Sequence, residues 1–356
     1  MPFLKLKQAP VSHVLEFEGA NYFRQRIIQS LLSSRPIRII NIRPREQNPG
    51  LHDFEANLLR LIDAITNGTK IEVNQTGYYL EVLLFVGPFC KLPLRVTLNG
   101  VTNNQIDPSP DQIKYSMLPL LKRYYIDEGL ELKINRRGMP LEGGGQIYFT
   151  CPVKRSLKPM QFTDPGLVKR IRGVAYGCRV SPATATRILE AAKAVLTNFV
   201  PDVYIYSDHR RGDQAGNSPG FGITLVAETT KEVYYTAEVC SNSSKSKEPS
   251  VPEFIGEECA EKLLDQIFNG GCVDDLSQSL AFQYMILCPK DVCKILVGEK
   301  LTPYSIQYLK HIKEFFGIMF KIDEVRPEAE DTVGVSVNHM MTCVGSGFTN
   351  LNKTTL

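Results

Sequence analysis

Residues 302–322 read TPYSIQYLKHIKEFFGIMFKI, and this stretch contains the repeating unit of the chain. Thr302 followed by Pro303 predicts the start of a helix, because a hydroxyl suits the N-cap and proline suits the first helical position. Gly317 suits the helix end, where a left-handed residue is common. Apolar residues at helical spacing predict the buried face of this helix: Ile306, Leu309, Ile312 and Phe316. Residues 318–322 then follow as a predicted strand.

The same unit, a helix followed by a short strand, recurs along the chain. The other pairs cover residues 21–33 with 36–43, 111–125 with 130–134, and 182–199 with 203–206. Further strands are predicted over 94–98, 146–150, 222–228 and 232–239, and a further helix over 253–268. This alternation predicts an α/β (α+β) fold in which helices cover sheets. We expect repeated helix-and-sheet units in a large domain, residues 1–183 and 276–356, with a small α/β insert domain over residues 184–275.

Composition is that of a globular protein. The chain has 356 residues, of which 43% are hydrophobic and 22% charged, and these values exclude a coiled coil, a collagen and wholesale disorder. The net charge is only +3, yet residues 154–179 carry seven basic side chains against Asp164 alone. Such a cluster is compatible with a face that follows phosphates and equally with solvated surface charge. Both interpretations stay open.

The absence of several sequence motifs predicts where the protein resides and whether it binds a metal. The N-terminus has no apolar signal region, so we expect an intracellular protein. The longest apolar run, residues 78–90, is too short to span a bilayer and contains Glu81. Nine cysteines without a CxxC pair and five scattered histidines predict reduced thiols and no metal site.

Two glycine-rich stretches differ in what they predict. Gly216-Asn217-Ser218-Pro219-Gly220 fits GxSxG, but a strand rather than a helix follows the serine, which favours a turn over an esterase elbow. Gly143-Gly144-Gly145 allows close backbone approach by a ligand or by another strand. Arg136 and Arg137 lie beside it and could bind an anion, so a structural turn and an anion site are both open.

Further basic residues form two more candidate sites. Asn48-Pro49-Gly50-Leu51 opens a helix, and helix N-termini attract anions. The arginines that could face this point are Arg24, Arg26, Arg43 and Arg45. The other candidate is the set Lys310, His311 and Lys313, expected on the polar side of one helix. That set could bind phosphate or move a proton, or it is a solvated face.

Several stretches, in this order and spacing, make the chain resemble the RNA 3′-terminal phosphate cyclase superfamily, in particular its cyclase-like, ribosome-biogenesis branch. They are Asn21-Tyr22-Phe23-Arg24-Gln25-Arg26, Asn48-Pro49-Gly50-Leu51 with Asp53-Phe54-Glu55, Thr66-Asn67-Gly68, Arg137-Gly138 with Gly143-Gly144-Gly145, Arg172-Gly173-Val174-Ala175-Tyr176 with Arg179-Val180-Ser181-Pro182, Ser218-Pro219-Gly220-Phe221-Gly222 and Gly345-Ser346-Gly347-Phe348.

This resemblance implies a fold of repeated helix-and-sheet units with a small inserted domain. It also implies two contrasting activities. True cyclases adenylate a histidine, transfer the AMP to an RNA 3′-phosphate and close a 2′,3′-cyclic phosphate, which requires a nucleophilic histidine. The cyclase-like branch is associated instead with the nucleolus, the small-subunit processome, early pre-rRNA cleavages and a ribosome-assembly GTPase.

The chain departs from the cyclase pattern at four places. Tyr304 stands where the adenylated histidine is expected, and the next histidine is His311. Glu18-Gly19-Ala20-Asn21 replaces a glycine-rich loop, and Phe282-Gln283 replaces an Asp-Gln pair. After Asn74-Gln75-Thr76-Gly77 the family continues for some tens of residues that this chain lacks. We therefore expect cyclase activity to be lost.

The leading hypothesis is a non-catalytic ribosome-biogenesis factor of the nucleus and nucleolus, without a cofactor, that meets pre-rRNA, other processome components and a GTPase. The alternative is a site-specific pre-rRNA endonuclease that uses Lys310, His311 and Lys313, and an active RNA 3′-phosphate cyclase is the least favoured. A metal-dependent nuclease would need carboxylates, which that basic set does not offer.

Overall fold

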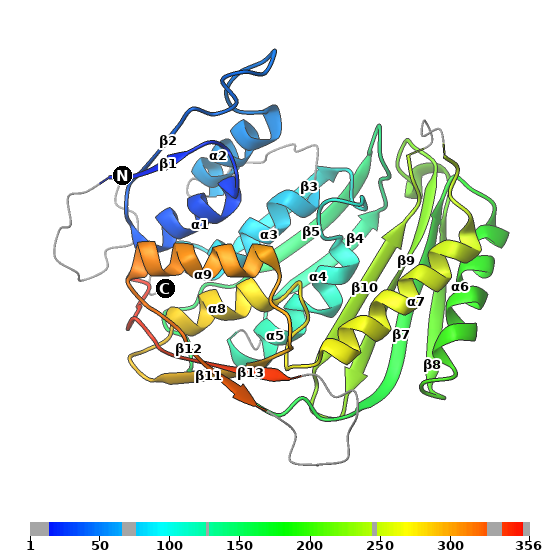
Figure 1. The fold of residues 1–356 in the computed structure, drawn as a ribbon. Coiled ribbons are helices and arrows are strands. Elements are labelled where there is room, and N and C mark those ends of the chain that lie inside the picture. Colours follow the sequence, from blue (N-terminus) through cyan, green and yellow to red (C-terminus); the bar gives the residue numbers. More distant parts are fainter. Residues whose placement is uncertain (1–13, 66–75, 126–127, 244–247, 326–336, 352–356) are drawn as a thin grey trace.

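The computed structural model describes residues 14–65, 76–125, 128–243, 248–325 and 337–351, and its fold is α/β (Figure 1). Residues 66–68 and 74–75, which contribute to the resemblance, lie outside the described residues.

The first part of the chain forms two small sheets around a buried helix. Strands β1 (Leu15–Glu18) and β2 (Ile37–Ile40) pair in parallel, with helix α1 (Phe23–Ser33) between them in sequence, and α2 (Asp53–Ile65) follows. Strands β3 (Leu94–Gly100), β5 (Gly145–Cys151) and β4 (Glu131–Arg136) form an antiparallel sheet in that order. Helix α3 (Thr76–Val86) and the short 3-10 helix η1 (Gly87–Phe89) are buried throughout, and Glu81 lies inside this apolar core.

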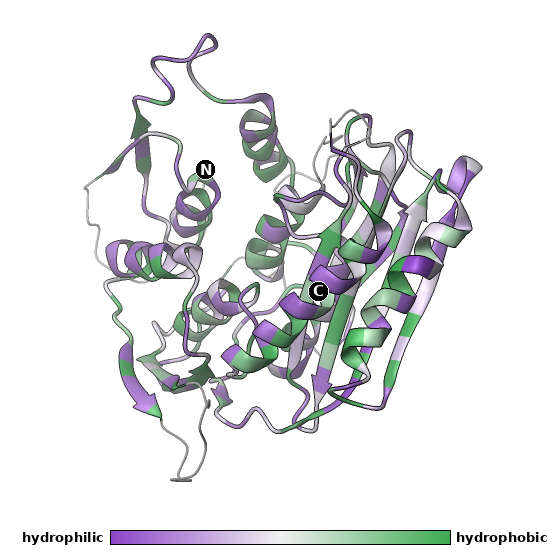
Figure 2. Ribbon diagram, turned by 45° about the vertical axis from the view of Figure 1, so that its right-hand side comes forward, coloured by the Kyte–Doolittle hydropathy of each residue, from purple (hydrophilic) through white to green (hydrophobic). Residues whose placement is uncertain are grey.

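A four-stranded sheet in the order β10-β9-β7-β8 forms the middle part. Its strands are β7 (Val168–Cys178), β8 (Val203–Arg210), β9 (Gly220–Thr229) and β10 (Tyr234–Cys240), with the 3-10 helix η2 (Gly212–Gln214) after β8. Helices α6 (Pro182–Leu196) and α7 (Pro252–Asn269) cover one face, and Figure 2 shows that the middle strands are largely hydrophobic while these helices carry hydrophilic residues. The other face meets α4 (Pro110–Tyr115) at β9 and β10, whereas Tyr204 and Tyr206 on the edge strand β8 are 55% and 54% exposed.

The last part of the chain forms a mixed sheet in the order β12-β13-β11-β6. The strands are β6 (Gln161–Phe162), β11 (Val292–Val297), β12 (Lys321–Val325) and β13 (Asn338–Val344). Helices α8 (Gln278–Ile286) and α9 (Pro303–Phe316) pack against each other, and α9 also packs against α1. Helix α9 therefore joins the C-terminal and N-terminal ends of the fold (Figure 1).

Helix α9 has the predicted ends and part of the predicted buried face. The backbone N–H of Ser305 donates to the Thr302 hydroxyl at 3.0 Å, and Gly317 adopts φ 70° at the C-cap. Ile312 is buried, and Leu309 and Phe316 pack partly buried against the core, as predicted. The prediction was wrong for Ile306, which is 43% exposed, and it missed the buried Tyr308, His311 and Phe315. The buried face is wider than predicted because α9 contacts both α1 and α8.

Several elements differ from prediction. The expected single helix over 111–125 is two helices, α4 and α5 (Met117–Tyr124). Pro119 lacks the backbone N–H that would bond the Tyr115 carbonyl, and the Ser116 hydroxyl at the break bonds the buried carboxylate of Asp274. Strands β1, β6, β7 and β11 and helix α8 were not predicted. The expected limits of the small domain, 184 and 275, stay a prediction.

Candidate functional site

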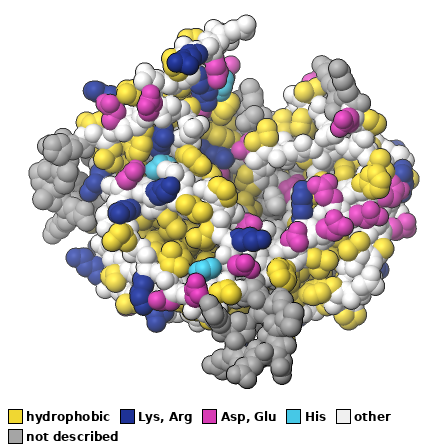
Figure 3. All heavy atoms as spheres, in the orientation of Figure 1, with side chains coloured by type: hydrophobic (Ala, Val, Ile, Leu, Met, Phe, Trp, Pro, Cys, Tyr) yellow, Lys and Arg dark blue, Asp and Glu magenta, His cyan; other side chains and the backbone are white. Residues whose placement is uncertain are grey.

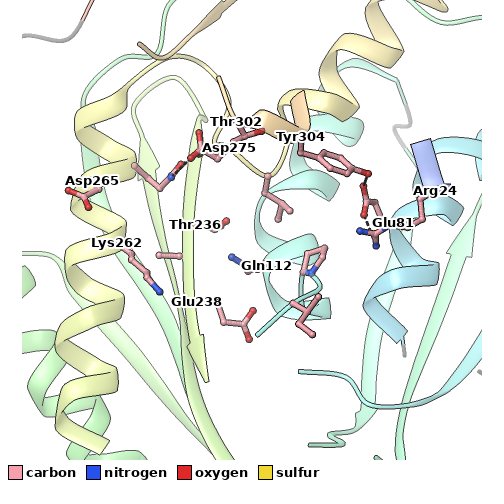
Figure 4. Close-up of a pocket in the computed structure, with 15 residues that line it drawn as sticks. Arg24, Glu81, Gln112, Thr236, Glu238, Lys262, Asp265, Asp275, Thr302 and Tyr304 are labelled. Atoms are coloured by element: carbon pink, nitrogen blue, oxygen red, sulfur yellow. Dashed lines mark hydrogen bonds and ion pairs between the residues drawn. The ribbon is translucent and has the colours of Figure 1, made fainter. Parts of the chain in front are cut away.

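A pocket of about 540 Å³ lies between the start of α9, helix α7 and residues 106–112 (Figure 4). Its walls come from parts of the chain that are far apart in sequence: Arg24 from α1, Glu81 from α3, Glu238 from β10, Lys262 from α7 and Tyr304 from α9. Pockets with a few convergent polar groups are the usual sites of ligand binding. This pocket is therefore the candidate functional site.

Tyr304 lies in the first turn of α9, on the wall of this pocket. Its hydroxyl donates to the Glu81 carboxylate at 2.7 Å. Burial, and then the negative charge of Glu81, raise the pKa of Tyr304 well above its ordinary value. The phenol therefore keeps its proton and is bound to a carboxylate, so it is a poor nucleophile.

Arg24 completes a chain of interactions around the same carboxylate. Its guanidinium lies 3.0 Å from Glu81 and 3.0 Å from Asp107, and it stacks over the Tyr78 ring at 4.3 Å. Burial lowers the pKa of Arg24, but the two carboxylates outweigh that effect and the pKa rises. Because internal carboxylates neutralise its charge, Arg24 is not available to bind an external phosphate.

The wall opposite Tyr304 is acidic. Glu238 accepts hydrogen bonds from the Tyr176 hydroxyl at 2.8 Å and from the Asn103 amide at 2.9 Å. Burial raises the pKa of Glu238 to about 7, despite these hydrogen bonds. Asp265 and Asp275 also line this pocket, and Figure 4 shows Asp265 near Lys262 and Asp275 near Thr302. This charge distribution favours a cationic rather than an anionic ligand.

The six arginines proposed as an anion face do not form one surface. Three besides Arg24 are also bound to protein groups. Arg43 makes two hydrogen bonds of 2.7 Å to Glu55, and Arg26 donates to the Gly19 carbonyl at 2.7 Å. Burial lowers the pKa of Arg26.

Arg137 is the most deeply buried of the six. Its guanidinium is 3% exposed and bonds Asp111 on α4 and Asp208 on β8, the latter at 2.8 Å. The interpretation of Arg137 as an anion site is therefore corrected: it links the β7–β10 sheet to the rest of the fold. Only Arg45 and Arg136 are exposed and, within the described part of the chain, make no side-chain hydrogen bond or ion pair.

The triple-glycine stretch is a close approach between two backbones. A Cβ at Gly216 would lie 2.1 Å from the Gly143 carbonyl oxygen, and the Ser218 hydroxyl accepts hydrogen bonds from the backbone N–H groups of Leu141 and Glu142. Another segment of the same chain, rather than a ligand, occupies the space that the glycines provide. Ser218 is buried in this contact, in agreement with a structural turn.

Lys310, His311 and Lys313 do not converge. The two lysines are exposed, whereas His311 is 1% exposed and faces α1. Its Nδ1 lies 2.9 Å from the Gln25 side-chain oxygen and its Nε2 lies 3.1 Å from the Gln307 amide nitrogen, which fits the neutral ring. Burial, and then the charge of Arg26, lower the pKa of His311 to about 4.

Sequence reasoning missed the acidic part of the site. Glu81 could have been found, because it is a single carboxylate inside an otherwise apolar run. Glu238, Asp265 and Asp275 carry no comparable signal. They belong to a strand, a helix and a loop that meet only in the folded chain. Phe282 and Gln283, which were expected to match the cyclase Asp-Gln pair, are buried in α8.

Comparison with known proteins gives consistent matches. A family model described as RNA 3′-terminal phosphate cyclase matches residues 15–76, and a model of the cyclase insert domain matches residues 163–268. The chain is 50% identical, over 373 aligned positions, to a human protein named RNA 3′-terminal phosphate cyclase-like, with 97% of this chain and 99% of that relative covered. The chain belongs to the RNA 3′-terminal phosphate cyclase-like family.

Other members of the cyclase-like family are similar over nearly the whole chain. A probable cyclase-like protein of Drosophila melanogaster is 47% identical, with 97% of this chain and 98% of the relative covered. A Schizosaccharomyces pombe relative that is named as an rRNA processing protein is 38% identical, with 95% and 97% covered.

The alignment to the human protein has 373 positions, whereas the chain has 356 residues. This difference shows that the cyclase-like relative contains residues that this chain lacks. The cyclase model ends at residue 76, at the junction where the sequence predicts a missing segment. In the described residues, no helix has the length and apolar character needed to cross a membrane.

Proposed function

We propose that this cyclase-like chain is a non-catalytic ribosome-biogenesis factor that acts in the small-subunit processome, in the nucleolus, for early pre-rRNA processing. Its proposed partners are pre-rRNA, other processome components and a ribosome-assembly GTPase. Support comes from the full-length similarity to cyclase-like proteins and from the S. pombe relative that is named as an rRNA processing protein.

The observation that carries the non-catalytic part is the interaction chain Arg24–Glu81–Tyr304. Cyclase chemistry needs a nitrogen nucleophile that attacks the α-phosphate of ATP and forms a labile P–N bond. Tyr304 offers a protonated phenol, bonded to Glu81, at the matching position. Moreover, the phosphates of a nucleotide in this pocket would lie near Glu81, Glu238 and Asp265 and would be repelled.

The catalytic test uses the purified full chain with α-labelled ATP and an RNA that ends in a 3′-phosphate. We expect neither label on the protein nor a 2′,3′-cyclic end on the RNA. Protein-bound label that disappears in Tyr304→Phe would contradict the proposal. The variant keeps the ring and removes only the hydroxyl, so it is a conservative control.

The cellular test asks whether processing depends on the protein but not on this hydroxyl. We expect depletion to block early pre-rRNA cleavage, and we expect wild type and Tyr304→Phe to restore it equally. Failure of Tyr304→Phe to restore cleavage, at normal protein level, would indicate that Tyr304 has a chemical role. Normal cleavage after depletion would remove the proposed role in rRNA processing.

The nuclease alternative is tested by incubating the protein with a pre-rRNA fragment that spans the early sites. The buried His311 is separated from solvent, so we expect no cut. A mapped cut that disappears in Lys310→Ala/Lys313→Ala would establish an endonuclease instead. For RNA binding, Arg45→Glu/Arg136→Glu should weaken affinity and reduce its salt dependence without a change in stability.

A further inference from the structure

A second hollow, of about 780 Å³, lies beside the candidate site along helix α7. Its lining is shared with the first pocket at several side chains, among them Ile106, Glu238 and Lys262. The two hollows are therefore one continuous groove, bounded by α7 and β10 on one side and by residues 104–112 on the other. We call it the α7 groove.

The α7 groove is strongly acidic. Among the described residues, seven carboxylates and two basic side chains line it: Glu81, Asp107, Glu238, Glu248, Glu258, Asp265 and Asp275 against Arg24 and Lys262. Arg24 pairs with Glu81 and Asp107, and the Lys262 ammonium lies 2.7 Å from Glu258. These three carboxylates offset both positive charges, so the described lining keeps a net negative charge. Figure 3 shows acidic side chains gathered over α7, so the groove repels nucleic acid.

Apolar side chains stand exposed along the same groove. Ile106 is 88% exposed, Phe254 is 67% exposed and Val251 is 41% exposed, and all three line the second hollow. Exposed apolar side chains beside a hollow and near polar groups are typical of protein interaction surfaces.

We propose that the α7 groove binds a protein segment that carries Lys or Arg side chains together with apolar ones. The carboxylates match the positive side chains, and Ile106, Val251 and Phe254 match the apolar ones. An RNA partner would meet this net negative charge, and the aromatic side chains in the described lining are Phe254 and Tyr304 alone. Binding at this groove does not depend on whether the site at Tyr304 is catalytic.

The first experiment measures fluorescence anisotropy of a labelled Lys/Leu peptide of about 18 residues, amphipathic as a helix, against the full chain. Helix α7 provides a matched pair of variants. Phe254 lines the groove, whereas Phe268, on the same helix and 60% exposed, does not. We expect Phe254→Ser to weaken binding about ten-fold, equivalent to about 1.4 kcal/mol, and Phe268→Ser to leave it unchanged.

A second pair of variants tests the charge. Glu258→Lys/Asp265→Lys reverses two carboxylates of the groove, and Glu257→Lys/Glu261→Lys reverses two exposed ones on the same helix outside its lining. The first should weaken binding more than the second and flatten its salt dependence. Circular dichroism and thermal unfolding establish that each variant is folded.

Several results would overturn the proposal. Equal affinity of Phe254→Ser and Phe268→Ser would show that the groove is not the binding surface. Equal binding of a Glu/Leu peptide would remove the charge argument, and displacement of the peptide by single-stranded RNA would make the surface a nucleic-acid site. Self-association that is lost in Phe254→Ser would make the occupant a second copy of the chain.

Discussion

The buried guanidinium of Arg137 offers the sharpest test of the structure. Arg137 lies just after β4, Asp111 lies on α4 and Asp208 lies on β8, so this cluster joins three elements that are distant in sequence. The guanidinium also stacks on the Tyr176 ring at 4.6 Å. We therefore expect Arg137 to stabilise the fold and not to bind RNA.

The perturbation is Arg137→Met, which keeps much of the side-chain length and removes the charge. It leaves Asp111, whose side chain is 4% exposed, without its cation, whereas Asp208, 23% exposed, keeps an ion pair of 2.6 Å with Arg210. Removal of one partner from a buried ion pair costs about 3–5 kcal/mol, and we expect a loss in this range at pH 7.

The pH dependence of the stability difference between wild type and Arg137→Met provides a second check. Burial raises the pKa of Asp208, but Arg137 outweighs it and the pKa is lowered. A lowered carboxyl pKa contributes stability above the unfolded value near 4, and that contribution is lost as the pH falls through the folded value. The difference between wild type and Arg137→Met should therefore shrink in acid.

The assay is urea unfolding, followed by fluorescence and by circular dichroism so that two-state behaviour is tested. Arg136→Met is the matched control, because Arg136 is exposed and should change stability by less than about 0.5 kcal/mol. A loss below about 1 kcal/mol for Arg137→Met, together with a loss of RNA affinity, would refute the reasoning and restore Arg137 as an anion-binding residue.

Three further predictions concern other buried polar groups. The pKa of His311 is lowered to about 4 in the folded state, so the free energy of unfolding should fall by on the order of 3 kcal/mol between about pH 6.5 and 4. The unfolding free energy of His311→Gln should depend less on pH in this range. The control His52→Gln, at an exposed site, should show the same pH dependence as wild type. The pKa of Glu238 is raised to about 7, so the protonated carboxyl contributes to folding stability in acid, and this contribution is lost as the pH rises from about 4.5 through 7. Unfolding at pH 8 should therefore show Glu238→Gln to be more stable than wild type. Tyr304→Phe removes the hydroxyl that donates to Glu81 and should cost about 1–3 kcal/mol of unfolding free energy in thermal or urea unfolding; an unchanged value would mean that this hydrogen bond adds no net stability.

Local sequence patterns predicted the family and many of the elements, but not β7, β11 or α8. Thr302, Pro303 and Gly317 mark the two ends of α9, because capping depends on residues within one turn of each end. The expectation that Tyr304 stands in place of the cyclase histidine also came from the sequence, since it needs only the order of motifs, and it stays a prediction. Helix α7 and the strands β9 and β10 likewise follow from periodicity and turn residues within a few positions of the observed ends.

The roles of the charged residues were decided only by tertiary structure. A sequence shows Arg24 and Arg137 as positive charges, but whether they meet phosphate or carboxylate depends on Glu81, Asp107, Asp111 and Asp208, which approach from other elements. The physical reason is that caps and periodicity act between neighbours in the chain. Coulombic pairing and desolvation depend on distance and burial in space, and long-range packing alone determines these.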